Sequence, residues 1–107
     1  MQEVEEELQT QQREQDELER RLRSAATSGD IDGIIALLDA GADIDAADAT
    51  GRFTALHVAS NNGHAAAVRL LLEAGAKVDV KTAGGSTPLR LAQEQSRAAV
   101  VAILQSL

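Results

Sequence analysis

One part of the sequence matches a later part of the same chain at a fixed spacing, and this restricts the fold more than any other feature. Residues 54–71 match residues 87–104 at an offset of 33, and residues 22–41 match residues 56–75 at an offset of 34. A fixed period of this length is typical of a repeat protein whose units stack on their neighbours. The change of period by one residue places an extra residue near Phe53.

Each unit has the start and stop signals of two antiparallel helices. Thr54 and Thr87 are suited to cap a helix N-terminus, and Pro88 follows where a missing N–H does no harm. Glycines close both helices of a unit by supplying a left-handed residue, and they are Gly29, Gly41, Gly63 and Gly75. The segments 42–52 and 76–86 are rich in Asp, Gly, Thr and Ser, so they are predicted to be extended turns between successive helix pairs.

These units predict an all-α solenoid of about three repeats, at approximately residues 22–53, 54–86 and 87–107. No unit can bury its apolar face alone, whereas three stacked units are close to the minimum for independent stability. The repeat domain is therefore expected over residues 22–107, preceded by an acidic polar helix over residues 1–21.

The repeated segment resembles a known family. Residues 54–79, TALHVASNNGHAAAVRLLLEAGAKVD, are similar to the ankyrin repeat in its T-x-L-H opening, G-H turn and V-x-L-L-L helix. Residues 87–107 resemble a terminal repeat in which Arg90 and Ser96-Arg97 replace the usual His and Gly-His. Residues 22–45 resemble a first repeat without the T-P-L-H entry, so its first helix is expected to continue the polar helix.

The resemblance implies protein recognition through the turns, which project as fingers, and through the concave side of the first helices. Fold alone does not specify a partner. The family's variable contact positions correspond here to Thr27, Ser28, Ala49, Thr50, Arg52, Asn61, Asn62, Lys81, Ala83, Ser86, Glu94 and Gln95. These side chains are mostly small or polar and include no Tyr or Trp anchor, which predicts modest affinity.

Composition argues against several other functions. The net charge of −7 repels phosphate backbones, and Phe53 is the only aromatic residue, so a nucleic acid is not the expected partner. The chain has no cysteine, which removes disulfides and thiolate chemistry. It has neither a signal sequence nor an apolar run of membrane-spanning length, so we expect a soluble, cytoplasmic protein, with the nucleus as the alternative.

Three local patterns resemble ligand-binding sites, and each has a simpler structural interpretation. His57 and His64 occupy positions of the repeat, where the resemblance implies that the ring of His57 bonds between neighbouring loops. Asp43, Asp45 and Asp48 lack the glycine and closing glutamate of a calcium loop. The segment 83–86, Ala-Gly-Gly-Ser, lacks the lysine of a phosphate loop. We therefore expect no metal, no cofactor and no enzymatic activity.

The N-terminal helix leaves alternatives open. Its residues Val4, Leu8, Gln11, Gln15, Leu18 and Leu22 follow the spacing of a coiled-coil seam, which two glutamines interrupt. The acid–base pairs 16 with 20, 17 with 21 and 19 with 23 would instead support a single solvated helix. The alternatives are a solvated or partner-dependent helix, a weak homodimer through residues 1–22, and packing against the repeats. The expected function is an adaptor or scaffold that binds another protein, with self-association through this helix as the alternative.

Overall fold

The computed structural model describes residues 2–107. Met1, the first residue of the expected polar segment, lies outside the described residues. Six helices follow one another: α1 (Gln2–Ser28), α2 (Ile31–Asp39), α3 (Ala55–Asn61), α4 (Ala65–Glu73), α5 (Pro88–Glu94) and α6 (Ala98–Gln105). No strand occurs within the described residues, so the all-α prediction is confirmed. None of these helices is both long and apolar enough to cross a membrane.

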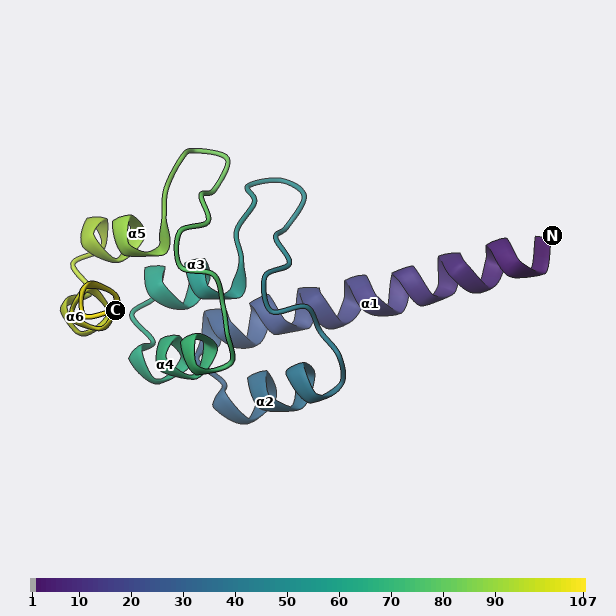
Figure 1. The fold of residues 1–107 in the computed structure, drawn as a ribbon, viewed down its shortest axis with the longest axis horizontal. Coiled ribbons are helices and arrows are strands. Elements are labelled where there is room, and N and C mark those ends of the chain that lie inside the picture. The colour runs from purple at the N-terminus through teal and green to yellow at the C-terminus, as the bar shows by residue number, and fades with distance from the viewer. Residues whose placement is uncertain (1) are drawn as a thin grey trace.

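The helices form three stacked pairs (Figure 1). The first helices α1, α3 and α5 lie side by side, and the second helices α2, α4 and α6 form a parallel row against them. Two long turns rise from the stack between the pairs, which confirms the expected projections. We call residues 42–52 the first finger and residues 76–86 the second finger.

Sequence signals at the helix ends have the predicted roles. Thr54 and Thr87 each accept a hydrogen bond from a backbone N–H in the first turn of the helix that follows, and Pro88 occupies the first helical position. The four glycines predicted to close helices have φ between +72° and +102°. At the corresponding place after α5 stands Ser96, which has a left-handed φ of +57° although it is not glycine.

The core lies between the two rows of helices and consists of small aliphatic side chains. Leu22, Ile34, Leu56, Leu71 and Val100 are each at most 1 % exposed. Alanine side chains occupy the positions where neighbouring helices come close together, as expected for a stack without large aromatic residues.

The N-terminal helix continues into the first repeat without a break. α1 spans 27 residues, about 40 Å at the usual helical rise, and the N-terminus lies at the far end of the molecule from the C-terminus (Figure 1). Residues 3–14 are exposed throughout, whereas Leu18 is partly buried and Leu22 is 1 % exposed. We call residues 2–14 the projecting segment.

This burial changes the interpretation of the predicted coiled-coil seam. Leu18 and Leu22 pack in the core of the first repeat, and Gln15 donates from Nε2 to the Gly41 carbonyl, 2.9 Å away. The C-terminal half of the seam is therefore occupied by the protein's own repeats. Only Val4, Leu8 and Gln11 remain on an exposed surface.

Two of the three predicted acid–base pairs are also absent among the described residues. Glu17 pairs with Arg21 as expected and with Arg20 in addition, whereas Asp16 accepts from Gln12. The carboxylate of Glu19 and the guanidinium of Arg23 reach the backbone of the first finger instead. Both side chains are engaged by this finger, which is why they do not pair with each other.

Candidate protein-binding surface

Hydrogen bonds within each finger fix the shape of its tip. In the first finger the Asp48 N–H donates to the Phe53 carbonyl at 3.0 Å, and in the second the Thr82 N–H donates to the Ser86 carbonyl at 2.9 Å. These bonds enclose four residues in the first tip and three in the second. The extra residue expected near Phe53 therefore lies in the tip at 49–52.

The longer tip is held by one carboxylate. Asp48 Oδ1 accepts from the N–H groups of Gly51 and Phe53, at 3.0 and 3.1 Å. The hydrogen bond from Phe53 is the main reason that the pKa of Asp48 is lowered below its usual range. Arg52, the last residue of the tip, has a left-handed φ of +57°. This conformation costs a non-glycine residue about 1 kcal/mol.

The two fingers are joined to each other. The Ala83 N–H donates to the Gly51 carbonyl at 2.9 Å, near the tips. Closer to the helices, Asp45 Oδ1 accepts from the Lys77 N–H at 2.9 Å. The tips thus present a preformed surface, and a partner does not have to order them on binding.

His57 anchors the second finger, as the resemblance implied. Its side chain is fully buried; Nδ1 accepts from the Thr54 N–H at 3.1 Å, and Nε2 donates to the Val80 carbonyl at 2.8 Å. Because Nδ1 accepts, the ring is neutral with its proton on Nε2. Burial lowers the pKa of His57 below its usual value, although the bonds to the Val80 and Ser86 carbonyls oppose this shift.

The first repeat departs from the repeat pattern, and other residues there make the contacts that anchor its finger. Arg23, at the first-repeat position equivalent to His57, donates from Nη1 to the Ala46 carbonyl at 3.3 Å. Ala46 is the counterpart of Val80, so the arginine anchors the first finger where the histidine anchors the second. Glu19 likewise accepts from the Asp43 N–H at 3.1 Å, as Asp45 does from Lys77. The first repeat therefore keeps its contacts without the T-P-L-H entry.

The structure separates the predicted contact residues into two groups. The finger group lies on the fingers and is exposed except for the partly buried Ser86. It consists of Ala49, Thr50, Arg52, Lys81, Ala83 and Ser86. The helix-end group lies on or just after the last turns of the first helices. It consists of Thr27, Ser28, Asn61, Asn62, Glu94 and Gln95. The fingers lead into the N-termini of α3 and α5, so the second group lies at the opposite ends of these helices.

The helix-end group offers fewer free polar groups than its sequence indicates. The hydroxyls of Thr27 and Ser28 donate to carbonyls of their own helix, and Asn62 Nδ2 donates to the Val58 carbonyl at 2.9 Å. The Asn61 carbonyl accepts from Arg97. The finger group, whose side chains carry the free cations, is therefore the stronger candidate for recognition.

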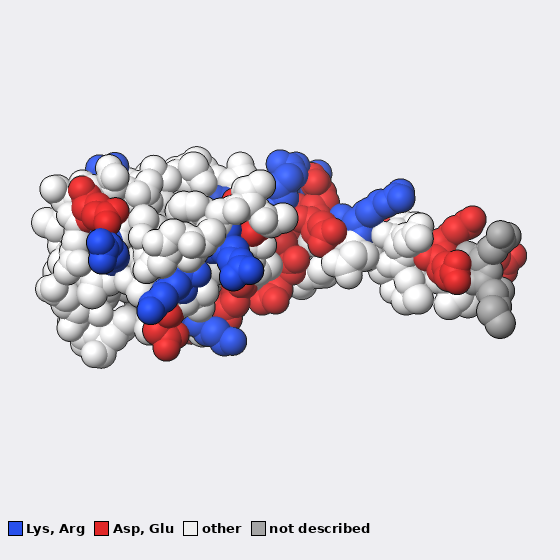
Figure 2. All heavy atoms as spheres, turned by 90° about the horizontal axis from the view of Figure 1, so that it is seen from above, with Lys and Arg blue, Asp and Glu red and all other residues white. Residues whose placement is uncertain are grey.

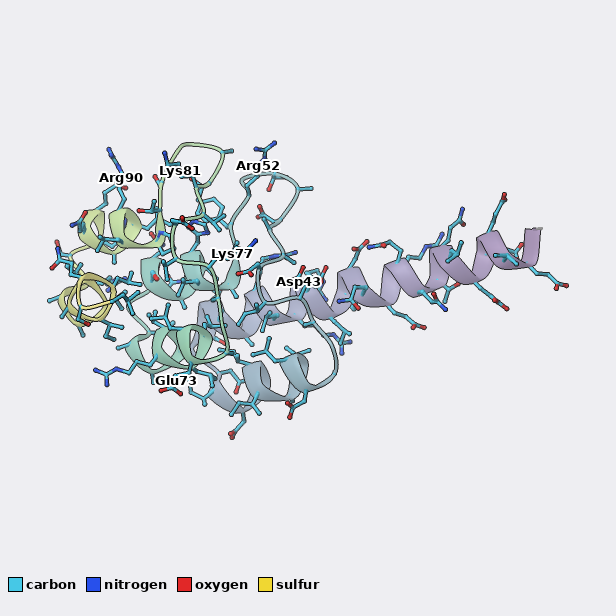
Figure 3. The ribbon with its side chains drawn as sticks, in the orientation of Figure 1. Asp43, Arg52, Glu73, Lys77, Lys81 and Arg90 are labelled. Carbon is cyan, nitrogen blue, oxygen red and sulfur yellow. The ribbon has the colours of Figure 1, made fainter. Side chains whose placement is uncertain are left out.

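Exposed cations lie on the side of the molecule that carries the fingers, which we call the finger face. Arg52, Lys81 and Arg90 lie along its upper edge in Figure 3. Arg90 forms an ion pair with Glu94 at 3.0 Å, while neither Arg52 nor Lys81 has an ion-pair partner within the part of the chain described. Sequence reasoning missed Arg90 because it treated this residue only as a replaced histidine.

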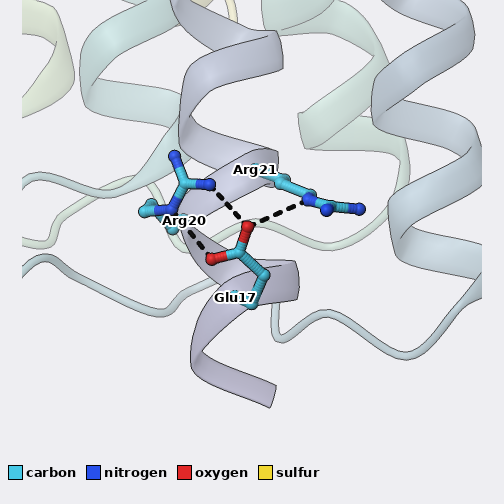
Figure 4. A network of polar contacts seen from close by, with 3 residues as sticks. All are labelled: Glu17, Arg20 and Arg21. Atoms are coloured by element: carbon cyan, nitrogen blue, oxygen red, sulfur yellow. Dashed lines mark hydrogen bonds and ion pairs between the residues drawn. The ribbon is translucent and has the colours of Figure 1, made fainter. Parts of the chain in front are cut away.

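A shallow hollow adjoins the finger face between α1 and the first finger. It is lined by Asp16, Glu19, Arg20, Arg23, Ala47 and Ala49, of which only Ala49 was predicted. Arg20, one of the lining residues, donates to Glu17, which also accepts from Arg21 (Figure 4). The hydrogen bond from Arg20, helped by Arg21, lowers the pKa of the partly exposed Glu17 to about 2. The hollow depends on the packing of α1, which the repeat pattern alone does not reveal.

The aspartates that imitate a calcium loop have backbone partners. Asp43 Oδ1 accepts from the Asp45 N–H at 3.0 Å, and Asp45 and Asp48 bind the N–H groups already described. Within residues 2–107 no group of three or more His, Cys, Asp or Glu side chains is placed to hold a metal ion. These carboxylates shape the first finger.

Comparison with known proteins identifies the fold family. The family model of ankyrin repeats, in three copies, matches residues 22–106. A search of curated proteins returned no match. Ankyrin repeats are in general protein interaction modules. The three helix pairs, the projecting fingers and this match together establish that the chain belongs to the ankyrin repeat family.

Proposed function

We propose that this protein is a non-catalytic adaptor that binds another protein through its finger tips and the adjoining first helices. The observation that carries the proposal is the bond from the Ala83 N–H to the Gly51 carbonyl, which joins two fingers whose tip side chains stay exposed. Such preorganisation favours binding because little conformational entropy is lost. Its place of action is the cytoplasm, with the nucleus as the alternative.

The proposal concentrates recognition on the finger group and assigns the helix-end group a secondary role. Arg52 and Lys81 supply charge, and Ala49, Thr50 and Ala83 allow a partner backbone to approach closely. Without a large aromatic anchor the surface supports modest affinity. The repeat domain over residues 22–107 provides this surface, and α1 adds a second contact.

Site-specific photocrosslinking tests the binding face. A benzophenone amino acid is placed at Ala83 on the second finger or at Ala66 on α4, both of which are exposed. A partner bound as proposed is crosslinked from position 83 and not from position 66. Binding of the captured protein to the purified chain is then measured with Arg52→Ala and Lys81→Ala, which are expected to weaken it. Equal crosslinking from both positions would refute recognition by the fingers.

A second candidate function is assembly through the N-terminal helix. Val4 and Leu8, one turn apart, are 58 % and 59 % exposed on the projecting segment. Two such segments offer a short apolar contact, although Leu18 and Leu22 are not free to extend it. Substitution of Val4 and Leu8 by Ser removes association if the helices pair through this stripe, and sedimentation equilibrium measures the effect.

A further inference from the structure

Charge is divided unevenly along the molecule. Residues 1–51 contain fourteen carboxylates and four arginines, whereas residues 52–107 contain three carboxylates and six lysines or arginines. Figure 2, which looks onto the finger face, shows carboxylates toward the N-terminal end of α1, and both cations and carboxylates over the rest of the molecule. These two parts of the chain have opposite net charge, and the first finger except Arg52 belongs to the acidic part.

The projecting segment has an acidic strip. Glu3, Glu6, Glu7 and Glu14 line one shallow surface of α1 together with Thr10 and Gln11. Within the described residues none of these glutamates has an ion-pair partner. Glu3 and Glu7 are four residues apart, so their like charges repel across one helical turn. A cationic partner surface would relieve this repulsion.

Two cations, Arg52 and Lys81, lie on the fingers, whereas the carboxylates of the first finger are bonded to backbone N–H groups. Arg52 and Lys81 are exposed and unpaired within residues 2–107, and they lie on two fingers that a backbone hydrogen bond joins. Arg52 also holds a left-handed backbone conformation that glycine would adopt without strain.

The acidic strip cannot reach the fingers of its own molecule. α1 is one helix from Gln2 to Ser28, and Leu22 fixes it in the core of the first repeat. The projecting segment consequently points away from the stack, as Figure 1 shows. The opposite charges can meet only between molecules.

We infer that the finger face binds the acidic projecting segment of a second copy of this chain. The inference rests on the proposed function, because it uses the same finger surface and names its occupant. Electrostatic complementarity of this kind guides association and sets the orientation of the two copies. It weakens with added salt, since the charges on both surfaces are exposed to solvent.

Charge reversal on each surface tests the inference. One variant carries Arg52→Glu and Lys81→Glu, and a second carries Glu7→Lys and Glu14→Lys. The control is Arg69→Glu, which reverses an exposed cation on α4. Sedimentation velocity is recorded at roughly 5 to 200 µM protein in about 20 mM and 500 mM salt, which spans strong and weak screening. Circular dichroism confirms that each variant is folded.

The expected result is association of the wild-type chain at tens of micromolar in low salt, weakened at least tenfold in high salt. Each double variant alone is expected to be monomeric, and the control is expected to associate. A mixture of the two double variants is expected to associate, because each acidic surface then meets a basic one.

Two results overturn the inference. One is a wild-type chain that stays monomeric in low salt. The other is a finger variant that associates like the wild type while a chain without residues 2–14 does not, which means that the helices pair with each other. Neither result affects crosslinking of a different partner from position 83, so the proposed function is judged separately.

Discussion

Arg97 donates from Nε to the carbonyl oxygen of Asn61 at 3.0 Å, and this reproduces one repeat later the contact of His64 with the Thr27 carbonyl. An unrelated side chain thus links the third repeat to the second as the histidine links the second to the first. Arg97 departs from the repeat motif in sequence, yet it makes the contact that the motif histidine makes elsewhere.

Arg97→Ala is expected to lower the free energy of unfolding by about 1 kcal/mol, because the hydrogen bond to the Asn61 carbonyl is lost. Arg97→His should retain most of the stability, since His64 makes the equivalent bond. Urea unfolding of the wild type and the two variants measures the change in stability. It is expected as a shift of the unfolding midpoint with an unchanged dependence of the unfolding free energy on urea concentration. An unchanged midpoint for Arg97→Ala would show that the contact contributes nothing.

Ser96→Gly is expected to raise the free energy of unfolding by about 1 kcal/mol, because glycine adopts the left-handed φ at this turn without strain. The reverse exchange, Gly63→Ser, should destabilise the equivalent turn. There φ is +73°, and an added Cβ would lie 2.7 Å from Cδ of Arg97. Thermal unfolding compares the two variants, and shifts of the same sign would contradict the argument.

Stability is expected to fall as the pH drops below about 6.5 because of His57. Burial lowers the folded-state pKa of this residue, so the unfolded chain takes up a proton near pH 6.5 while the folded chain does not. The stabilisation is therefore complete above pH 6.5 and decreases in more acidic solution. His57→Gln should remove the dependence between pH 7 and 5, and His64→Gln should preserve it. Denaturant titrations at several pH values supply the measurement.

Ser60→Ala is expected to stabilise the protein by about 1 kcal/mol. The Ser60 hydroxyl is buried in α3 with no hydrogen-bond partner in the structure, and Ala26 fills the equivalent position in the first repeat. Ser24→Ala in α1 is the control, because Ser24 is exposed and reports only the gain in helix propensity. Equal gains at the two sites would mean that the buried hydroxyl carries no penalty.

Removal of residues 2–14 is expected to leave the free energy of unfolding nearly unchanged, because the side chains of residues 3–14 are exposed. Removal of residues 2–21 should lower it by about 2 kcal/mol or more, since it deletes Leu18, the bond from Gln15 to the Gly41 carbonyl and the bond that Glu19 accepts from the Asp43 N–H. Chemical denaturation at about 1 µM protein, where association contributes little, separates the two truncations.

The sequence predicted those parts of the fold that depend on local chemistry. Caps at Thr54 and Thr87 and left-handed glycines act over one turn of the chain, and the repeat period fixes which helices are neighbours. The partner of Arg23 was not predictable in this way, because its contact with Ala46 joins residues 23 positions apart. The same reason explains Glu19, which was expected to pair along its helix and instead binds the first finger.

The candidate surface was predicted less completely. Positions on the fingers follow from alignment to the repeat, and the structure places them on exposed tips. Whether a polar side chain there is free depends on its rotamer and on neighbouring helices, as Thr27 and Asn62 show. The acidic strip on the projecting segment was visible as composition, but its separation from the fingers required the three-dimensional course of α1.

The unbroken course of α1 has a mechanical consequence. A flexible linker would let anything attached at the N-terminus reorient freely, whereas a helix without a hinge holds it at a set distance and angle from the fingers. A force applied near Glu3 is transmitted along the helix to Leu22 and loads the core of the first repeat directly. The position and direction of the N-terminal end are therefore set by the packing of α1 in the first repeat.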